Sequence, residues 1–469
     1  MGRLVIVSNR VTTPSERPGR AGGLAVAMRD TLRKNGGVWF GWSGKTVRET
    51  LQEPKIEVDG NVTFATLDLG AADHEQYYAG FSNSTLWPVL HYQVGLIEYR
   101  RESFGGYMRV NAQFARALLP LLEPDDVIWV HDYHFFPFGN ELRKLGVTNR
   151  IGFFLHTPFP TTEVLTCVPQ HQTLVNALCS YDLIGFQTEN DMRALKDYIV
   201  NEIGGNVHAT GIISAFGRRT RACVFPIGID TEEFVETAVT AGKSRETKRM
   251  CESLRTRHLI IGVDRLDYSK GIPRRFDAFR ELLNVHPDLR SKVTLMQIAP
   301  PSRSEVAQYQ ELRKELEQIA GNINGEFAEF DWVPIRYLNK SFTRQMLAGF
   351  YRISRVGLVT PLRDGMNLVA KEYVASQDPE DPGVLVLSRF AGAARELDSA
   401  LIVNPFDIDQ MMDAIKRALS MTLEERLVRW ERMMDVIRDN TVMAWHDRFL
   451  RTLRRTPQTS TQTMSRLVS

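Results

Sequence analysis

Residues 356–376 read VGLVTPLRDGMNLVAKEYVAS. The unbroken apolar run Val356–Val359 predicts a strand that is buried on both faces. The sequence Asp364-Gly365-Met366-Asn367 predicts a turn that opens a helix, and the residues after it continue that helix. A buried strand, a polar turn and a helix in this order form the repeating unit of α/β folds.

The same alternation of short apolar runs and longer amphipathic stretches covers the chain. Buried strands separated by helices indicate parallel sheets, so we predict an α/β fold with two doubly wound, Rossmann-like halves. The predicted strands are Leu4–Val7, Val127–Val130, Ile151–Leu155, Leu183–Phe186, Leu259–Val263, Val293–Ile298, Val356–Val359, Val384–Leu387 and Leu401–Val403. The predicted helices include Ala112–Leu119, Phe276–Val285, Val306–Ile319 and Met411–Ala418.

The length of 469 residues suggests two or three domains, at about 100–200 residues each. The stretch Thr231–Arg257 is charged, helix-prone and poor in apolar runs, and a predicted strand follows it. We therefore predict an N-terminal domain over residues 1–235 and a C-terminal domain over residues 236–455, whose last helix can pack back on the first domain. Residues 456–469 are rich in Ser, Thr and Gln and predict a flexible tail.

The composition argues against several classes of protein. The 58 basic and 56 acidic residues give a net charge of +2, whereas a nucleic-acid binder carries a basic stripe. The four cysteines form no CxxC pair, which fits reduced thiols in the cytosol. The first apolar run is too short for a signal peptide, and no stretch approaches the roughly 20 apolar residues of a membrane span. We expect a cytoplasmic protein without nucleic-acid or membrane partners.

Polar residues follow several of the predicted strands directly. His131-Asp132-Tyr133-His134, His156-Thr157-Pro158 and Asp264-Arg265-Leu266-Asp267 stand at such positions, as do Thr360 to Gly365. Ligands of open α/β sheets bind outside the carboxyl ends of the strands. Since these residues occur in both halves, we expect two domains that face a deep cleft.

Arg265 and Lys270 suit a diphosphate, because Arg offers a fork of donors and Lys a point charge. An ordinary solvated loop, with ion pairs to Asp264 and Asp267, is the alternative. The turn Asp364–Asn367 would aim backbone N–H groups and a helix dipole at an anion. Glu372, one or two turns further on, could accept hydrogen bonds from ribose hydroxyls; an ordinary capped helix is the alternative here.

Other signals are weaker when each is taken alone. Gly22 and Gly23 would let the backbone approach a ligand, but they match no nucleotide-binding fingerprint. His156 is more often a structural residue than a catalyst at such a position. The spacing of His131 and His134 fits no zinc pattern, and the sequence Asp-Ile-Asp at 407–409 reads as the start of a helix. The aromatic residues Trp39, Trp42, Tyr77, Tyr78, Trp87 and Tyr92 suit a carbohydrate pocket and a core equally.

Long strings over residues 1–455 carry a resemblance to a known family. They include LVIVSNR, AGGLAVA, VIWVHDYH, RIGFFLHTPFP, VDRLDYSKGIP and TPLRDGMNLVAKEYVASQ. These strings resemble the trehalose-6-phosphate synthases, retaining glycosyltransferases of family 20 with the two-domain GT-B architecture. The resemblance implies transfer of glucose from a nucleotide-glucose donor to glucose 6-phosphate. Uridine is the common base in the family, while guanosine and adenosine stay open.

The resemblance also assigns roles by position. On the donor side, Asp364 would hold the transferred glucose, Glu372 the ribose, and Phe342 the base through its backbone. His156 would contact the transferred glucose, and Asp132 would hold an acceptor hydroxyl near the reacting carbon. The donor set is Gly22, Gly23, Arg265, Lys270, Phe342, Asp364, Leu368, Val369, Ala370, Lys371 and Glu372. The acceptor set is Arg10, Trp42, Tyr78, Trp87, Asp132 and Arg303, and the catalytic set is His156, Asp132 and Asp364.

No metal or other cofactor is expected, since Arg265, Lys270 and a helix N-terminus could neutralise the leaving diphosphate. No carboxylate can be argued to be a covalent nucleophile, so we expect front-face attack through an oxocarbenium-like ion pair. Two alternatives remain at this point: the same donor chemistry with another phosphorylated acceptor, and a non-catalytic subunit that binds sugar phosphates. The resemblance further implies a homo-oligomer, a dimer or tetramer.

Overall fold

The computed structural model describes residues 2–15, 32, 36–303 and 306–458. The chain forms two compact units: Ile227–Ala444 make up unit 2, and the residues up to Pro226, with those from Trp445 onward, make up unit 1. The chain passes from unit 1 into unit 2 after Pro226. The first helix after this point, α9 (Thr231–Gly242), belongs to unit 2 and packs on four further helices of that unit.

Unit 1 is built on a mixed sheet that has ten strands within the described residues. Seven strands, from β4 to β10 in the pairing order, are parallel neighbours, and antiparallel strands complete both edges. In pairing order the strands are β3 (Lys55–Asp59), β4 (Val62–Gly70), β2 (Gly37–Val47), β1 (Leu4–Arg10), β5 (Val127–His131), β6 (Arg150–Phe154), β7 (Leu183–Phe186), β10 (Arg218–Val224), β9 (Ile212–Ala215) and β8 (Asn206–Val207).

The last helix, α17 (Val442–Arg455), packs on the sheet of unit 1. The rings of Trp445 and Phe449 lie 4.8 and 4.6 Å from the ring of Trp129, measured between centroids. Gly152 on β6 permits this packing, because a Cβ atom there would come within 2.8 Å of Phe449. Apart from short 3-10 turns, the other helices in the described part of unit 1 are α2 (Ala71–Asp73), the π-helical segment η1 (His74–Leu86), α3 (Trp87–Leu90), α4 (Arg101–Leu118), α5 (Phe138–Lys144), α6 (Thr162–Leu165), α7 (His171–Leu178) and α8 (Glu189–Asn201).

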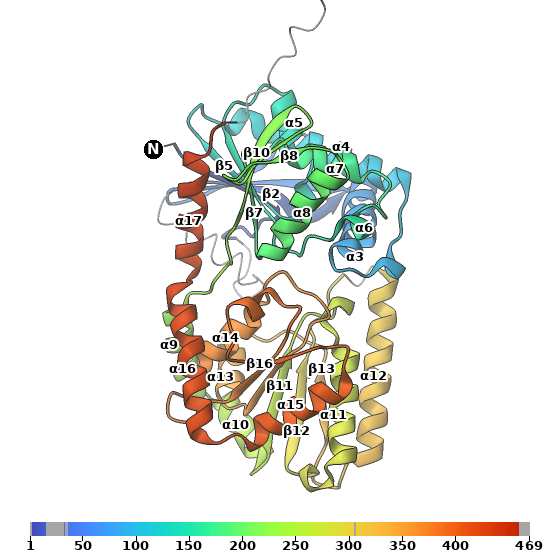
Figure 1. Ribbon diagram of the computed structural model, residues 1–469, viewed down its shortest axis with the longest axis vertical. Coiled ribbons are helices and arrows are strands. Elements are labelled where there is room, and N and C mark those ends of the chain that lie inside the picture. Colours follow the sequence, from blue (N-terminus) through green and yellow to red (C-terminus); the bar gives the residue numbers. More distant parts are fainter. Residues whose placement is uncertain (1, 16–31, 33–35, 304–305, 459–469) are drawn as a thin grey trace, which may run out of the picture. The chain divides into compact units, whose positions relative to one another are not determined.

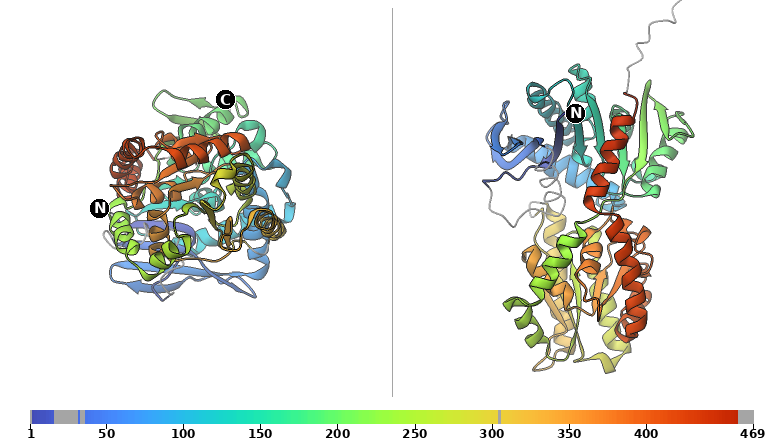
Figure 2. Two further views of the ribbon diagram at one scale, coloured as in Figure 1. Left: turned by 90° about the horizontal axis from the view of Figure 1, so that it is seen from below. Right: turned by 90° about the vertical axis from the view of Figure 1, so that its left-hand side faces the viewer.

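Unit 2 has an all-parallel sheet of six strands within the described residues. Two groups of helices flank it, with α11, α12 and α15 in one group and the remainder in the other (Figures 1 and 2). The strands in pairing order are β13 (Ile335–Leu338), β12 (Val293–Ile298), β11 (His258–Val263), β14 (Val356–Val359), β15 (Val384–Ser388) and β16 (Leu401–Val403). The helices are α9, α10 (Arg245–Leu254), α11 (Ile272–Val285), α12 (Ala307–Phe327), α13 (Arg344–Arg352), α14 (Leu368–Ser376), α15 (Ile408–Ser420) and α16 (Leu423–Asp439).

The prediction of an α/β fold with two doubly wound parallel-sheet units is confirmed. Each of the nine apolar runs forms a strand, because a strand covered on both faces buries every side chain; β12 and β14 are buried along their full length. The sequence did not predict the antiparallel strands at the edges of unit 1. No helix in the described ranges is long and apolar enough to cross a membrane.

Local signals explain where several helices begin. Asp407 is the N-cap of α15 and accepts a hydrogen bond from the backbone N–H of Gln410 at 2.9 Å, so the interpretation of residues 407–409 as a helix start is confirmed. Gly271 precedes α11 with a φ of +66°, in the left-handed region that glycine enters at little cost. A Cβ atom at Gly271 would also lie 2.8 Å from the carbonyl oxygen of Thr360.

Candidate active site

The carboxyl end of β11 carries the first predicted donor residues in unit 2. Arg265 follows the strand with an exposed side chain, and Lys270 ends a short 3-10 turn, Tyr268–Lys270. The Lys270 ammonium lies 2.5 Å from the carboxylate of Asp364, which follows β14. Residues 94 positions apart in the sequence thus meet at one edge of the sheet, as the strand-end rule predicts.

The N-terminus of α14 lies beside this ion pair. Asn367 precedes the helix with a φ of +74°, and its side chain donates to Asp364 at 3.1 Å instead of capping the helix. The first N–H groups of an α-helix have no partner within the helix. The backbone N–H groups of Leu368, Val369 and Ala370 therefore carry the partial positive charge of the helix end without a side-chain cap from Asn367.

Two further donor residues lie on α14 and have different surroundings. Glu372 is partly buried, and burial raises the pKa of its carboxyl to about 7, although Arg344 favours the charged form. Lys371 is fully buried; its ammonium bonds to the carboxylate of Glu396 and to the carbonyl oxygen of Ile227, both at 2.7 Å. The side chain of Lys371 thus holds unit 2 together, and its backbone is the part that could face a ligand.

The base-binding prediction falls on Phe342, which lies in the segment before α13. Its ring is half-buried and packs edge-on against Phe350 with centroids 5.7 Å apart. The ammonium of Lys340 lies 5.2 Å from the Phe342 ring, a cation–π distance. The backbone at this position is thereby fixed by packing of its side chain.

A buried arginine that the sequence did not single out supports the donor edge. Arg275 on α11 is fully buried, and its guanidinium contacts Asp264 and Gln297, both at 2.7 Å, and the hydroxyl of Thr360 at 3.1 Å. These partners follow or belong to β11, β12 and β14. Gly262 leaves room for them, because a Cβ atom there would lie 2.5 Å from the Arg275 guanidinium.

Arg303, predicted to bind the acceptor phosphate, is held within unit 2. Its guanidinium donates to the buried carboxylate of Asp267 at 3.0 Å and to the hydroxyl of Tyr309 at 2.6 Å. The backbone of Arg303 has a φ of +48°, which is uncommon for a residue other than glycine. Asp267 also accepts from the backbone N–H and hydroxyl of Ser269. One carboxylate thus connects Arg303 to the segment that carries Arg265 and Lys270.

Most of the predicted acceptor residues belong to unit 1. Arg10 ends β1, and its guanidinium donates to the carbonyl oxygens of Val11 and Ser43. The rings of Trp42 and Tyr78 lie 5.5 Å apart, and Tyr78 stacks on His134 at 5.9 Å with an angle of 11°. The structure thus brings two predicted aromatic residues together and stacks His134 on one of them.

Trp87 begins α3 and is buried. Its ring lies 4.0 Å from the ring of His91 and 5.6 Å from that of Tyr133, the residue after Asp132. The Tyr133 hydroxyl in turn donates to Asn83 at 2.9 Å. Residues of unit 1 thus hold the Trp87 ring close to the carboxyl end of β5.

Asp132 and His156 lie together at the carboxyl ends of β5 and β6. The backbone N–H of His156 donates to the Asp132 carboxylate at 3.2 Å. Asp132 has a φ of +78°, a conformation that costs of order 1–3 kcal/mol outside glycine and that occurs often at functional sites. The imidazole of His156 contacts that of His131, with Nε2 of the former 3.1 Å from Nδ1 of the latter.

The sequence profile of Glycosyltransferase family 20 matches residues 3–455. The chain belongs to glycosyltransferase family 20. It is 49% identical over 462 residues to a trehalose-6-phosphate synthase from Enterobacter sp. (strain 638), covering 98% of this chain and 97% of that protein. The predicted family is therefore confirmed, and the chain is a glycosyltransferase.

Two solved structures resemble the chain over 97% of its length. One is a UDP-forming alpha,alpha-trehalose-phosphate synthase from Burkholderia xenovorans in complex with glucose-6-phosphate, with a TM-score of 0.93, 54% identity and full coverage of that chain. The other is from Escherichia coli, is bound with UDP-2-fluoro glucose, and gives a TM-score of 0.93, 48% identity and full coverage. The GT-B prediction for the two Rossmann-like units is confirmed by these neighbours.

The predicted residues of this family 20 chain do not all lie in described parts of the structure. Gly22 and Gly23 lie outside the described residues. Within the described ranges, no group of three His, Cys, Asp or Glu side chains is placed to hold a metal ion. Three residues that sequence reasoning did not assign to the site contact predicted residues: Asp267 and Tyr309 bond to Arg303, and His134 stacks on Tyr78. Asp267 and His134 follow predicted strands closely, whereas no sequence signal pointed to Tyr309 on α12.

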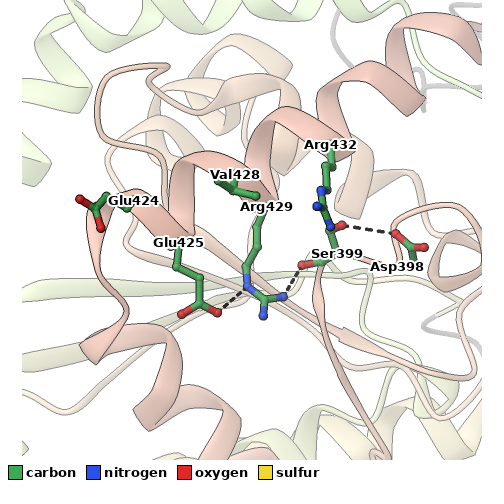
Figure 3. A pocket seen from close by; sticks show the side chains of 7 residues that line it. All are labelled: Asp398, Ser399, Glu424, Glu425, Val428, Arg429 and Arg432. Carbon is green, nitrogen blue, oxygen red and sulfur yellow. Dashed lines mark hydrogen bonds and ion pairs between the residues drawn. The ribbon is translucent and has the colours of Figure 1, made fainter.

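Figure 3 shows a surface pocket of unit 2 that is lined by residues of α16 and by Asp398 and Ser399. Its volume is about 530 Å³. Arg429 in its wall is paired with Glu425 at 2.8 Å and donates to the carbonyl oxygen of Ser399 at 2.8 Å. No residue predicted for this family 20 site lines the pocket, and Arg429 is already neutralised, so we assign the pocket no role in the transfer.

The imidazole of His156 is expected to stay neutral at physiological pH. Burial lowers its pKa to about 3. Because this folded pKa lies below the ordinary value of about 6.5, His156 contributes stability that is fully present above pH 6.5 and is lost as the pH falls toward 3. The NMR shifts of its ring should be constant from pH 8 to pH 5. A titration midpoint inside that range would contradict the assignment.

Proposed function

We propose that this chain transfers glucose from UDP-glucose to glucose 6-phosphate with retention of configuration, and forms trehalose 6-phosphate and UDP. The observation that carries the proposal is the arrangement of Lys270 and Asp364 at the N-terminus of α14, with Arg265 in the same segment after β11 as Lys270. This arrangement offers cations and backbone N–H groups to a diphosphate, and a carboxylate to sugar hydroxyls. The names of the relatives support both substrates.

On the donor side, the leaving UDP develops negative charge on its β-phosphate. Arg265, Lys270 and the first N–H groups of α14 would stabilise that charge, as preorganised donors do in other transfer enzymes. Lys270 would exchange its bond with Asp364 for a bond to phosphate, and Asp364 would then accept hydrogen bonds from the glucose. These groups supply the positive charge themselves, so we propose that the reaction needs no metal ion.

On the acceptor side, Arg10 and Arg303 would bind the phosphate of glucose 6-phosphate, with Trp42, Tyr78 and Trp87 around the sugar. Two cations and a set of aromatic faces are the groups that a sugar phosphate requires. Arg303 would leave Asp267 and Tyr309 when the phosphate binds. Tyr78 is supported from behind by His134, which favours one orientation of its ring.

For the transfer, an acceptor hydroxyl held by Asp132 would attack the anomeric carbon on the face that UDP leaves. The bond from the anomeric carbon to the phosphate oxygen breaks and leaves an oxocarbenium-like ion pair, and the acceptor oxygen then bonds to that carbon on the same face. The hydroxyl proton passes to the leaving phosphate oxygen, so charge and atoms balance without a protein nucleophile. Mass spectrometry of the enzyme incubated with donor alone tests this scheme, and a covalent glucosyl adduct would rule it out.

The proposed reaction is tested by measuring nucleotide release. UDP-glucose, GDP-glucose and ADP-glucose are each supplied with glucose 6-phosphate, glycerol 3-phosphate or a cyclitol phosphate. We expect release only when glucose 6-phosphate is present, with UDP-glucose the best donor. Release with a different acceptor would favour the alternative transferase. Binding of glucose 6-phosphate without any release would favour a non-catalytic subunit.

Glu372 makes UDP binding depend on pH in this proposal. The pKa of about 7 means that the carboxylate, which is the stronger acceptor for ribose hydroxyls, forms as the pH rises from 6 to 8. We expect UDP affinity to increase about 3- to 10-fold over this range. Titration calorimetry should show a smaller increase of UDP affinity with pH for Glu372→Gln, because only the nucleotide phosphate still changes its charge. An equal dependence of UDP affinity on pH in the two proteins would contradict ribose binding by Glu372.

The proposal also covers the cellular compartment and the oligomeric state of the protein. The four cysteines, which are all free thiols, support a reducing compartment such as the cytoplasm. Self-association into a dimer or tetramer rests on the family resemblance, and sedimentation velocity would measure it. The domain limits at residues 235 and 455 are likewise proposals, which limited proteolysis would test.

A further inference from the structure

His131 ends β5 and is buried in unit 1 directly behind His156. Its ring has an exposed fraction of 1%, and Nδ1 lies 3.1 Å from Nε2 of His156. The two imidazoles are stacked, with centroids 5.3 Å apart and an angle of 26°. The sequence singled out His131 only as a candidate metal ligand, and the proposed reaction gives it no role.

The surroundings of His131 are aromatic. The rings of Trp129, Trp445 and Phe154 lie 4.5, 6.3 and 6.5 Å away. Nε2 of His131 is buried and has no hydrogen-bond partner among the described residues. The titratable groups that influence it are His156 and His446, and burial together with these two rings lowers the pKa of His131 well below its ordinary value. Both imidazoles of the pair are therefore neutral.

A hydrogen bond between two neutral imidazoles has one donor and one acceptor. If His131 accepted the bond at Nδ1, its proton would stand on Nε2, as a buried N–H without a partner. If His131 donates from Nδ1, Nε2 carries only a lone pair. A buried polar group without a partner loses its hydrogen bond to water. In folded proteins such unpaired N–H groups are rarer than unpaired acceptors. His131 is therefore the donor.

The direction of this bond fixes the tautomer of His156. Since Nε2 of His156 accepts from His131, the proton of the neutral ring stands on Nδ1. This nitrogen has no hydrogen-bond partner among the described residues, and it is not among the fully buried unpaired atoms, so it can reach a ligand. We propose that His131 is a positioning residue that holds His156 as the Nδ1–H tautomer, so that His156 donates a hydrogen bond to an oxygen of the transferred sugar.

The role for His156 rests on the proposed function, whereas the tautomer does not. The first experiment therefore uses the full-length protein without substrate. With ¹⁵N-labelled histidine, the ring couplings report which nitrogen carries the proton, and His156→Gln assigns the signals. We expect His156 protonated at Nδ1 and His131 protonated at Nδ1. Protonation of His156 at Nε2 would overturn the proposal, even if the enzyme makes trehalose 6-phosphate.

The second experiment compares two substitutions of His131. The amide N–H of His131→Asn can stand in for Nδ1–H, whereas His131→Leu cannot donate. We expect His131→Leu to lower kcat by ~10-fold, the effect of one neutral hydrogen bond, with little change in the KM of glucose 6-phosphate. His131→Asn should recover most of kcat and keep the Nδ1–H signal of His156.

A matched control separates this role from packing. His446 is a second buried imidazole of the same aromatic cluster, 5.6 Å from Trp129, and it makes no bond to His156. We expect His446→Asn to leave kcat and the tautomer of His156 unchanged. Equal losses of kcat in His131→Asn and His131→Leu would overturn the proposal and indicate a structural role. Should His131→Leu fail to fold, the tautomer in the wild-type protein still decides.

Discussion

Arg265→Ala is expected to lower kcat/KM for the nucleotide sugar by about 10²–10³-fold, the usual effect of removing one preorganised donor from a developing anion. The side chain of Arg265 is exposed and follows the carboxyl end of β11, so the substitution removes a charge and little packing. The free energy of unfolding should therefore stay within about 0.5 kcal/mol of the wild-type value. Initial rates and urea unfolding measure the two quantities.

Arg280→Ala is the matched control for the loss of a positive charge. Arg280 lies on α11 of the same unit, is exposed, and forms a surface ion pair with Glu326 at 2.7 Å. Exposed pairs of this kind contribute about 0–1 kcal/mol. We expect this variant to keep both its rate and its stability. Normal UDP affinity in Arg265→Ala, or an equal loss of rate in Arg280→Ala, would remove Arg265 from the donor site.

The central strands could be predicted because a strand that is buried on both faces consists mostly of apolar residues. In β14 every side chain is buried and none is polar, and in β12 every side chain is buried and four of the six are apolar. The strand β10 has no such signal, since its seven residues include three arginines and it pairs antiparallel with β9 near the edge of the sheet. Its position depends on pairing with distant strands, which a local pattern does not report.

The candidate site divides in the same way. The strand-end rule placed Lys270 and Asp364 at one edge of unit 2, and the structure joins them. Contacts behind this edge, such as Asp267 with Arg303 or His131 with His156, depend on which side chains point toward each other across elements. Single-sequence periodicity gives the face of a strand or helix but not its partner on another element. The supporting residues therefore became visible only in the structure.

Arg275→Ala is expected to lower the free energy of unfolding of unit 2 by about 3–5 kcal/mol, the cost of leaving one partner of a buried ion pair behind. Arg275 and Asp264 are both buried, and their contact is 2.7 Å. Burial raises the pKa of Asp264, and Arg275 is the largest of the charges that oppose this shift. Without Arg275, Asp264 must remain charged without its partner or take up a proton.

A double-mutant cycle with Asp264→Ala distinguishes the ion pair from simple packing. If the pair dominates, the double variant is less destabilised than the sum of the two single variants, because neither charge is left alone. Native-state hydrogen exchange of peptides from β11, β12 and β14 confines the measurement to unit 2. Additive losses in the cycle would mean that Arg275 acts through its bonds to Gln297 and Thr360. In that case Arg275 would connect α11 to the ends of β12 and β14 through neutral partners.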